Sequence, residues 1–254
     1  MGKLIRESIA AAFIVTFFYA LFMPLPMTKY TLSDGEHTIV FQSMIHIARP
    51  DFYKSVETDA KSYADNGYTF LYEGIRAGKV DNSHNEADIP SYDISSYMLG
   101  LTSQSSNQYF SFVRSIPNSA DADVDVDWIL AQYATHGIVV KKQTPMSKEE
   151  LTNLINNIKK HHRLYAAIGV PLSRVAARVG HLKVEFAELT DSYSPADQVI
   201  LVNRNKVLYD AIVNSHADKI YINYGAAHFP NFYYLLKSHN SNWHIVDEDS
   251  FGAF

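Results

Sequence analysis

Three polar side chains stand at the ends of strand-forming runs and together could perform metal chemistry. His46 follows the run TIVFQSM closely, Glu73 follows YTFLY, and His228 follows KIYINYGAA. Ligands of an open parallel sheet gather at the carboxyl ends of its strands, so neighbouring strands would bring these groups into one crevice. Two imidazoles and one carboxylate can hold a divalent transition metal and leave positions open for water or substrate. The sequence therefore predicts a metal site at His46, Glu73 and His228.

The residues before His228 are all small, in the order Gly225, Ala226 and Ala227. Small residues let the backbone turn sharply and let a ligand approach without side chains in the way. A structural interpretation stays open for each candidate: a histidine at a strand end can be a hydrogen-bonded capping group, and Glu73 could pair with Arg76.

The elements that must position these groups follow from periodicity. Residues 38–44 are predicted to form a strand, 49–67 a helix that stops at Asn66-Gly67, and 68–74 a second strand. This strand–helix–strand order implies a parallel pair. Near the end of the chain, 203–216 read as a helix, 218–225 as a core strand and 230–239 as a last helix. We expect an α/β fold with a mostly parallel central sheet flanked by helices.

The middle of the chain is predicted to add a helical region. A capping box at residues 147–150 should start a helix that ends at Gly169, and residues 170–200 should be helical and irregular. Four aspartates alternate at positions 121, 123, 125 and 127, but the spacing of glycine and glutamate does not fit a calcium loop. We expect an exposed strand edge with a solvated aspartate face there.

The N-terminus carries an apolar segment. Lys3 and Arg6 precede residues 9–27, which contain no charge and would span about 28 Å as a helix, close to the ~30 Å hydrocarbon thickness. We therefore divide the chain into a membrane anchor or signal segment, 1–29, and an α/β domain, 30–254. The basic N-terminal end favours a single-pass protein whose domain lies outside the cytoplasm. If the segment is a cleaved signal, the domain is secreted or periplasmic; a buried N-terminal helix is the third alternative.

Composition excludes several classes of function. The 254-residue chain is 47% hydrophobic with a net charge of −5, which gives no basic surface for nucleic acid. It contains no cysteine, so disulfides, thiolate ligands and a cysteine nucleophile are excluded. The absence of G-x-S-x-G, P-loop and G-x-G-x-x-G motifs argues against a serine hydrolase, a nucleotide kinase and a Rossmann dehydrogenase. The oligomeric state stays open.

Four blocks of the sequence resemble, in order, the TraB/PrgY/GumN and Tiki superfamily, which is related to the erythromycin-esterase and ChaN-like fold. The blocks are FQSMIHIARPDFY, FLYEGIR, LVNRNKVLYDAI and IYINYGAAHFPNFYYLLK, spanning residues 38–238. The family pattern has G-x-x-H after the first strand, Glu-Gly at the second, Arg-Asn at a late helix and a second G-x-x-H. Ser43 stands where the first motif has glycine, so a side chain limits how closely a ligand approaches that corner.

The resemblance marks His46, Glu73, Arg204, Gly225 and His228. It implies a membrane-tethered, Tiki-like metalloprotease that acts on peptide or protein substrates with a divalent metal of the manganese, cobalt or zinc type. The histidines would bind the metal, Glu73 would be a ligand or general base, and Arg204 would pair with a substrate carboxylate or an oxyanion, beside Gly225.

The alternative that the resemblance implies is a binding module for haem or a peptide, without turnover. Tyr224, Phe229 and Tyr233 would then line the crevice. A membrane-anchored scaffold with structural histidines is the third hypothesis.

Overall fold

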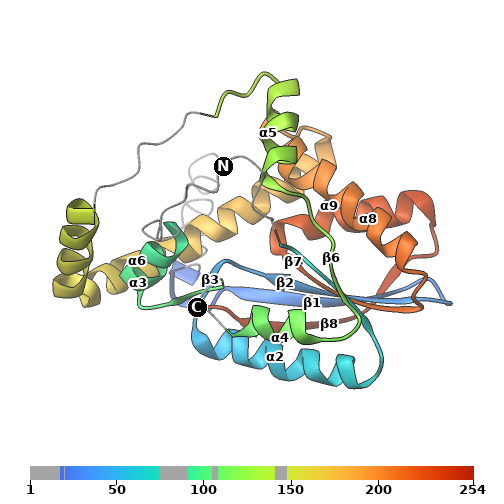
Figure 1. Cartoon of the computed structure of the whole chain (residues 1–254), viewed down its shortest axis with the longest axis horizontal. Coiled ribbons are helices and arrows are strands. Elements are labelled where there is room, and N and C mark those ends of the chain that lie inside the picture. Colours follow the sequence, from blue (N-terminus) through green and yellow to red (C-terminus); the bar gives the residue numbers. More distant parts are fainter. Residues whose placement is uncertain (1–17, 20, 75–90, 105–107, 141–147) are drawn as a thin grey trace, which may run out of the picture.

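A six-stranded mixed sheet forms the centre of the computed structural model, with helices on both of its faces (Figure 1). The structure describes residues 18–19, 21–74, 91–104, 108–140 and 148–254. The strand order is β6-β4-β7-β2-β1-β8, and β3 pairs with β5 in a separate two-stranded sheet. The expected α/β fold with a largely parallel sheet and flanking helices is confirmed.

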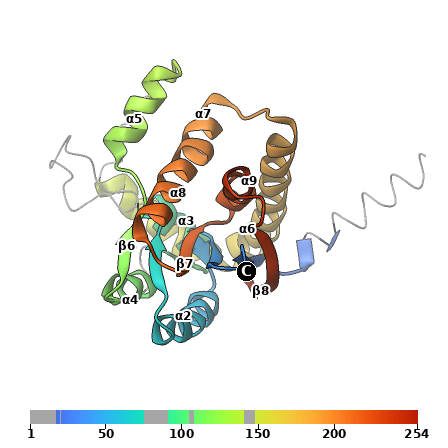
Figure 2. The same ribbon diagram turned by 90° about the vertical axis from the view of Figure 1, so that its right-hand side faces the viewer.

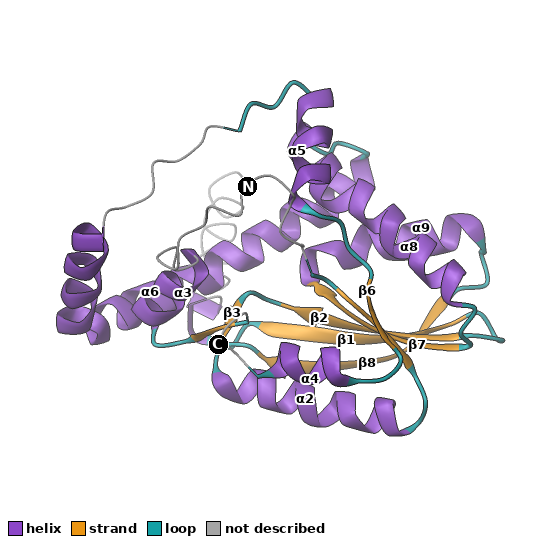
Figure 3. Ribbon diagram, in the orientation of Figure 1, coloured by secondary structure: helices purple, strands orange, loops and turns teal. Residues whose placement is uncertain are grey.

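The strands are β1 (Pro26–Ser33), β2 (Thr38–Met44), β3 (Ile47–Ala48), β4 (Thr69–Tyr72), β5 (Thr102–Ser103), β6 (Ser119–Asp121), β7 (Lys219–Gly225) and β8 (His244–Gly252). The helices are α2 (Pro50–Asp65), α3 (Ser91–Leu99), α4 (Tyr109–Ser115), α5 (Val126–Thr135), α6 (Lys148–Thr190), α7 (Pro195–Asp197), the π-helix η1 (Gln198–Asn203), α8 (Arg204–Ser215), the 3-10 turn η2 (Ala226–His228) and α9 (Phe229–His239). Figure 3 shows how these helices and strands are arranged.

Four neighbouring strands, β6, β4, β7 and β2, run parallel, and β1 runs antiparallel between β2 and β8. The predicted strands at 38–44 and 68–74 correspond to β2 and β4. They are parallel, as their connection through α2 requires, but β7 lies between them. Met44 pairs with Gly225 and Tyr72 with Asn223, so the carboxyl ends of β2, β7 and β4 lie side by side.

Side-chain alternation along the parallel strands divides the core into two layers. Tyr221 of β7 faces the layer that contains α2 and α4, whereas Ile220 and Ile222 face the layer that contains α8 and α9. All three are at most 2% exposed. Figure 2 shows these two helical layers on opposite faces of the sheet. The strands that carry the site residues are therefore packed on both faces.

Helix α6 is longer than the sequence predicted. The expectation that Gly169 ends the helix is wrong, because α6 continues through Gly169 and Pro171 to Thr190. Gly169 instead allows close packing on α3: a Cβ atom there would lie 2.4 Å from Leu99 Cδ2. The first residue of α6 is Lys148, while Ser147 of the predicted capping box lies outside the described residues.

The apolar N-terminal segment is described only from Phe18 onward, without residue 20, and residues 9–17 lie outside the described part. Strand β1 begins at Pro26, within the last residues of this segment. Within the described ranges, no helix combines the length and apolar character needed to cross a bilayer.

Candidate functional site

The end of β7 brings His228 to the carboxyl edge of the sheet. Gly225 ends the strand, and the single 3-10 turn of Ala226–His228 leads directly into α9. His228 is 3% exposed, and its imidazole packs edge-on against the ring of Tyr224. Its position is therefore fixed by the strand before it and the helix after it.

Glu73 follows β4 and reaches across to the end of β7. Its backbone N–H donates to the carbonyl of Asn223, and its Oε2 accepts a 2.6 Å hydrogen bond from the backbone N–H of Gly225. A Cβ atom on residue 225 would lie 3.1 Å from that oxygen. Glycine is thus favoured here because the Glu73 carboxylate approaches the backbone closely.

A buried guanidinium joins the Glu73 carboxylate to a second acidic group. Arg204, the first residue of α8, donates from Nη2 to Glu73 Oε1 at 2.7 Å. It also donates to both oxygens of Asp123, from Nε at 2.9 Å and from Nη2 at 2.6 Å. Arg204 is 2% exposed and Asp123 is 3% exposed. Among the described residues, this network holds two carboxylates and one guanidinium.

Asp123 was missed as a site residue in the sequence, and the expected solvated aspartate face is wrong. Strand β6 ends at Asp121, after which the chain turns Asp123 inward to Arg204. Asp125 instead caps α5 by accepting from the Trp128 N–H at 2.8 Å. The alternation of aspartates resembled an exposed edge, and the sequence offered no signal that one of them pairs with an arginine far along the chain.

Two asparagines orient the His228 ring. The Nδ1 of His228 lies 2.8 Å from Asn205 Oδ1, and the Nδ2 of Asn205 donates to the His228 carbonyl at 2.9 Å and to Asn231 Oδ1 at 3.0 Å. An amide oxygen only accepts, so Nδ1 carries the proton and Nε2 is the nitrogen with a free lone pair. Asn205 follows Arg204 in the Arg-Asn pair, which is the one sequence signal that pointed to it.

The charges of the site are set by burial and by this geometry. Burial lowers the pKa of His228 to about 4, assisted by the positive charge of Arg204 and opposed by Glu73. Burial alone would raise the pKa of Glu73, but protonated His228 and the charge and hydrogen bond of Arg204 lower it to about 2. At neutral pH the site therefore holds a neutral imidazole beside an ionised carboxylate.

The structure brings two of the three predicted metal ligands together. His228 Nε2 lies 3.9 Å from Glu73 Oε1. His46 is exposed on the loop after β2, where its carbonyl accepts from the Gln104 N–H. Its positive charge, when it is protonated, lowers the pKa of both Glu73 and His228. All three therefore share one edge of the sheet, although His46 stands apart from the close pair.

The donor set fits a divalent metal at two positions. A ligating histidine usually donates its second ring nitrogen to a fixed acceptor, as His228 does to Asn205. Ligands at about 2.1 Å from a shared ion lie roughly 3–4 Å apart, which the separation of His228 and Glu73 matches. Among the residues that the structure describes, no group of three or more histidine or carboxylate side chains is placed to hold a metal. A third protein ligand would require a shift of the exposed His46.

Other predicted partners of the site are placed differently. Ser43, at the family glycine position, is buried in β2 opposite Tyr224. Tyr224 is itself fully buried and donates to the Ala122 carbonyl, and Phe229 is in the core. Neither aromatic ring is therefore open to haem. Arg76, the alternative partner of Glu73, lies outside the described residues.

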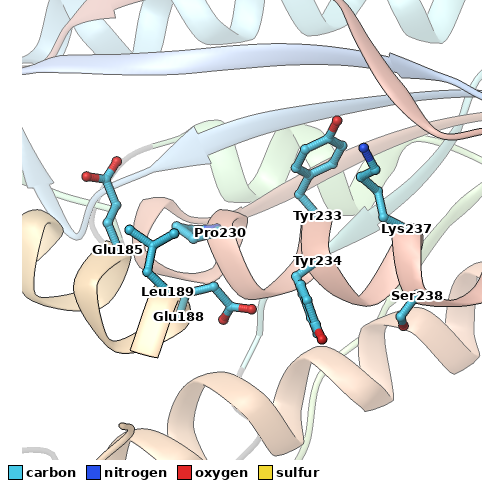
Figure 4. Close-up of a pocket in the computed structure, with 8 residues that line it drawn as sticks. All are labelled: Glu185, Glu188, Leu189, Pro230, Tyr233, Tyr234, Lys237 and Ser238. Carbon is cyan, nitrogen blue, oxygen red and sulfur yellow. The ribbon is translucent and has the colours of Figure 1, made fainter. Parts of the chain in front are cut away.

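A cavity of about 600 Å³ lies away from these groups, between α6 and α9 (Figure 4). It is lined by Glu185, Glu188, Leu189, Pro230, Tyr233, Tyr234, Lys237 and Ser238. Of the three aromatics predicted near the crevice, only Tyr233 lines this cavity. Glu188 links the cavity wall to the site, because its Oε2 accepts from Asn231 at 3.0 Å and Asn231 in turn accepts from Asn205.

Neither family models, nor curated proteins, nor solved structures gave a match to this chain.

Proposed function

We propose that this chain is a metal-dependent hydrolase of peptide substrates, attached to a membrane by its N-terminal apolar segment. The observation that carries the proposal is the pair of His228 Nε2 and Glu73 Oε1, 3.9 Å apart at the carboxyl edge of a parallel sheet. The imidazole is neutral, its other nitrogen is held by Asn205, and the carboxylate is ionised. In the described network the carboxylates outnumber the guanidinium, which also favours a cation.

The protonation states of the site residues indicate their roles. His228 would hold the metal through Nε2, and His46 would be the third protein ligand. A general base works best with a pKa near the operating pH, so the low pKa of Glu73 favours a ligand role for Glu73 over a base role. A bound divalent metal supplies an acidified water and polarises the scissile carbonyl.

Arg204 acts as a positioning residue in this proposal. Its guanidinium is buried and donates to Glu73 and Asp123, so it has little surface left for a substrate carboxylate. It keeps Glu73 ionised and fixes the oxygen that faces His228. The sequence-based role for Arg204, direct pairing with substrate or oxyanion, is therefore replaced by an indirect one.

The peptide substrate rests on the resemblance of the four sequence blocks to Tiki-like proteases. The test uses the full chain in detergent, stripped with a chelator and reloaded with Mn²⁺, Co²⁺ or Zn²⁺, and incubated with a peptide mixture analysed by mass spectrometry. We expect cleavage only after reloading, and its loss in Glu73→Gln and His228→Ala. The matched control His162→Ala removes an exposed histidine of α6 and should retain cleavage. Equal cleavage by the stripped and reloaded samples would refute the proposal.

A further inference from the structure

One face of α6 exposes large apolar side chains over much of its length. They are Leu164 (58% exposed), Ile168 (55%), Leu172 (55%), Val179 (59%), Leu182 (63%), Phe186 (64%) and Leu189 (86%). The last five, Leu172 to Leu189, are here called the α6 stripe. A helix on the surface of a soluble domain normally turns its apolar residues toward the core. The α6 stripe therefore indicates that this face contacts something other than water.

The spacing of the α6 stripe places its members on one side of the helix. Successive members from Val179 onward are three or four residues apart, and the stripe extends over about 26 Å at 1.5 Å per residue. The opposite side of α6 faces the domain, where Ala187 is buried and Glu188 bonds to Asn231. The stripe is thus a surface that the fold leaves uncovered within the described residues.

The start of the domain lies against the same helix. Arg174 donates from Nη1 to the Leu21 carbonyl at 3.0 Å, and Arg178 donates from Nη2 to the carbonyls of Met23 and Pro24 at 3.0 and 2.8 Å. The side chains of this segment are also apolar and exposed, namely Phe18 (53%), Tyr19 (58%), Phe22 (70%) and Met23 (44%). Two exposed apolar surfaces therefore meet beside Arg174 and Arg178.

The sequence before this junction points to a bilayer as the partner. Residues 9–27 are uncharged and long enough to reach across most of a bilayer, and their described end is the segment bound to α6. A membrane entered by this segment would lie beside α6. The apolar surface of α6 thus runs past the point where an apolar segment of membrane length joins the domain.

A second copy of the chain is the competing partner, because a spacing of three and four residues also suits a coiled coil. Such seams use flanking charges to pair helices. Here those charges have partners within the chain: Lys183 pairs with Asp197 at 2.9 Å, and Glu185 pairs with His181 at 3.3 Å. Arg178 is held by backbone carbonyls. These contacts favour a bilayer over a partner helix.

The cavity between α6 and α9 extends the same surface. It shares Leu189 with the far end of the α6 stripe, and its lining also includes Glu185, Lys237 and Tyr234, which is 64% exposed (Figure 4). Tyrosine is enriched where proteins meet the membrane–water interface, and lysine extends its charge to water from an apolar surface. Both residues suit the rim of a membrane contact.

We propose that α6 rests on the bilayer surface through the α6 stripe, so that the domain is held flat against the membrane. This inference uses the membrane attachment of the proposed function but not its hydrolytic chemistry. The bilayer removes the apolar side chains from water, while Arg174, Arg178 and Lys183 keep their polar partners at the edge.

The absence of cysteine allows a direct test with single-cysteine variants carrying a nitroxide label. The full chain is reconstituted in phosphatidylcholine vesicles with labels at Leu182→Cys and Phe186→Cys. Ser55→Cys, exposed on α2 across the sheet, is the matched control, and Ala12→Cys reports insertion of the N-terminal segment. Collisions with oxygen, which concentrates in lipid, are compared with collisions with a water-soluble nickel chelate.

We expect the oxygen-to-nickel ratio at Leu182 and Phe186 to be several-fold higher than at Ser55. A ratio equal to that of Ser55 would overturn the inference. Low collision rates with both reagents, together with spin–spin broadening, would also overturn it, in favour of a dimer. A high ratio at Ala12 with a water-like ratio at Leu182 would support insertion of the N-terminal segment and refute only the α6 contact. The hydrolytic activity of the proposed function is tested separately by the peptide-cleavage assay.

Discussion

Replacement of Arg204 by methionine should destabilise the domain more than replacement of an exposed charged residue. The guanidinium donates three hydrogen bonds, two to Asp123 and one to Glu73, and it is 2% exposed. Methionine keeps an apolar side chain of comparable length but removes the cation that bonds to buried Asp123 and to the half-buried Glu73. Breaking a buried ion pair by removing one partner costs about 3–5 kcal/mol in the free energy of unfolding.

The pKa of Glu73 makes this effect depend on pH, because protonated His228 and Arg204 are the main groups that lower it. Its fall from 4.5 to about 2 corresponds to about 3 kcal/mol of stabilisation. Because the folded pKa is lower than the unfolded one, this stabilisation is present above pH 4.5 and is lost as the pH falls toward 2. The Arg204→Met variant lacks the cation that favours the ionised form. The difference in free energy of unfolding between wild type and Arg204→Met should therefore become smaller below about pH 4.5.

The assay is urea unfolding of the chelator-treated full chain in detergent, followed by circular dichroism at pH 7 and at lower pH. In a thermal scan of a chain of this size, a loss of about 3–5 kcal/mol in the free energy of unfolding would lower the melting temperature by roughly 6–20 °C. The control Lys61→Met breaks an exposed pair with Glu57, which is worth only about 0.3–0.5 kcal/mol. If Arg204→Met lost no more stability than Lys61→Met, the buried ion network would not hold the site as described.

Three further predictions concern the same site. In chelator-treated protein, the lowered pKa of His228 should make the free energy of unfolding fall by about 3 kcal/mol from pH 6.5 to 4. Urea titrations of His228→Gln should lack this fall. If the variant showed the same dependence of unfolding free energy on pH as wild type, His228 would not be its source. Gly225→Ala should lower the free energy of unfolding in urea by about 1–3 kcal/mol, because its Cβ would crowd the fixed Glu73 carboxylate. Gly180 has open space around it, so Gly180→Ala should not destabilise the domain. Equal losses in the two variants would argue against crowding at residue 225. Asn205→Ala should weaken metal binding by about 10–100-fold in a titration, since the His228 ring loses its acceptor; an unchanged Kd would show that Asn205 does not orient the ring.

The strands that carry the site could be predicted because each is a short apolar run bounded by turn residues. The predicted strand 38–44 coincides with β2, and the corners at Glu73 and His228 lie where the runs end. Their order could not be predicted locally, since β7 enters between β2 and β4 from a distant part of the chain. The shared edge of the sheet was thus predictable, while the neighbour relations were not.

The remaining features depend on tertiary contacts that leave little local signal. Asp123 cannot be told in sequence from Asp121, Asp125 and Asp127, because its pairing with Arg204 is a contact between distant parts of the chain. Gly169 looks like a helix stop, yet it lies inside α6, where the absence of a side chain lets Leu99 pack closely against it. Strand β8 exposes most of its side chains, so its sequence lacks the apolar pattern of a core strand.

Calorimetric titration of the chelator-treated full chain with Mn²⁺ tests the proposed metal site most directly. We expect wild type and His162→Ala to bind one equivalent per chain, and His228→Ala to lose that binding while its circular dichroism spectrum stays unchanged. Binding by His228→Ala equal to that of wild type would contradict the account. So would a wild-type chain that binds none of Mn²⁺, Co²⁺ and Zn²⁺.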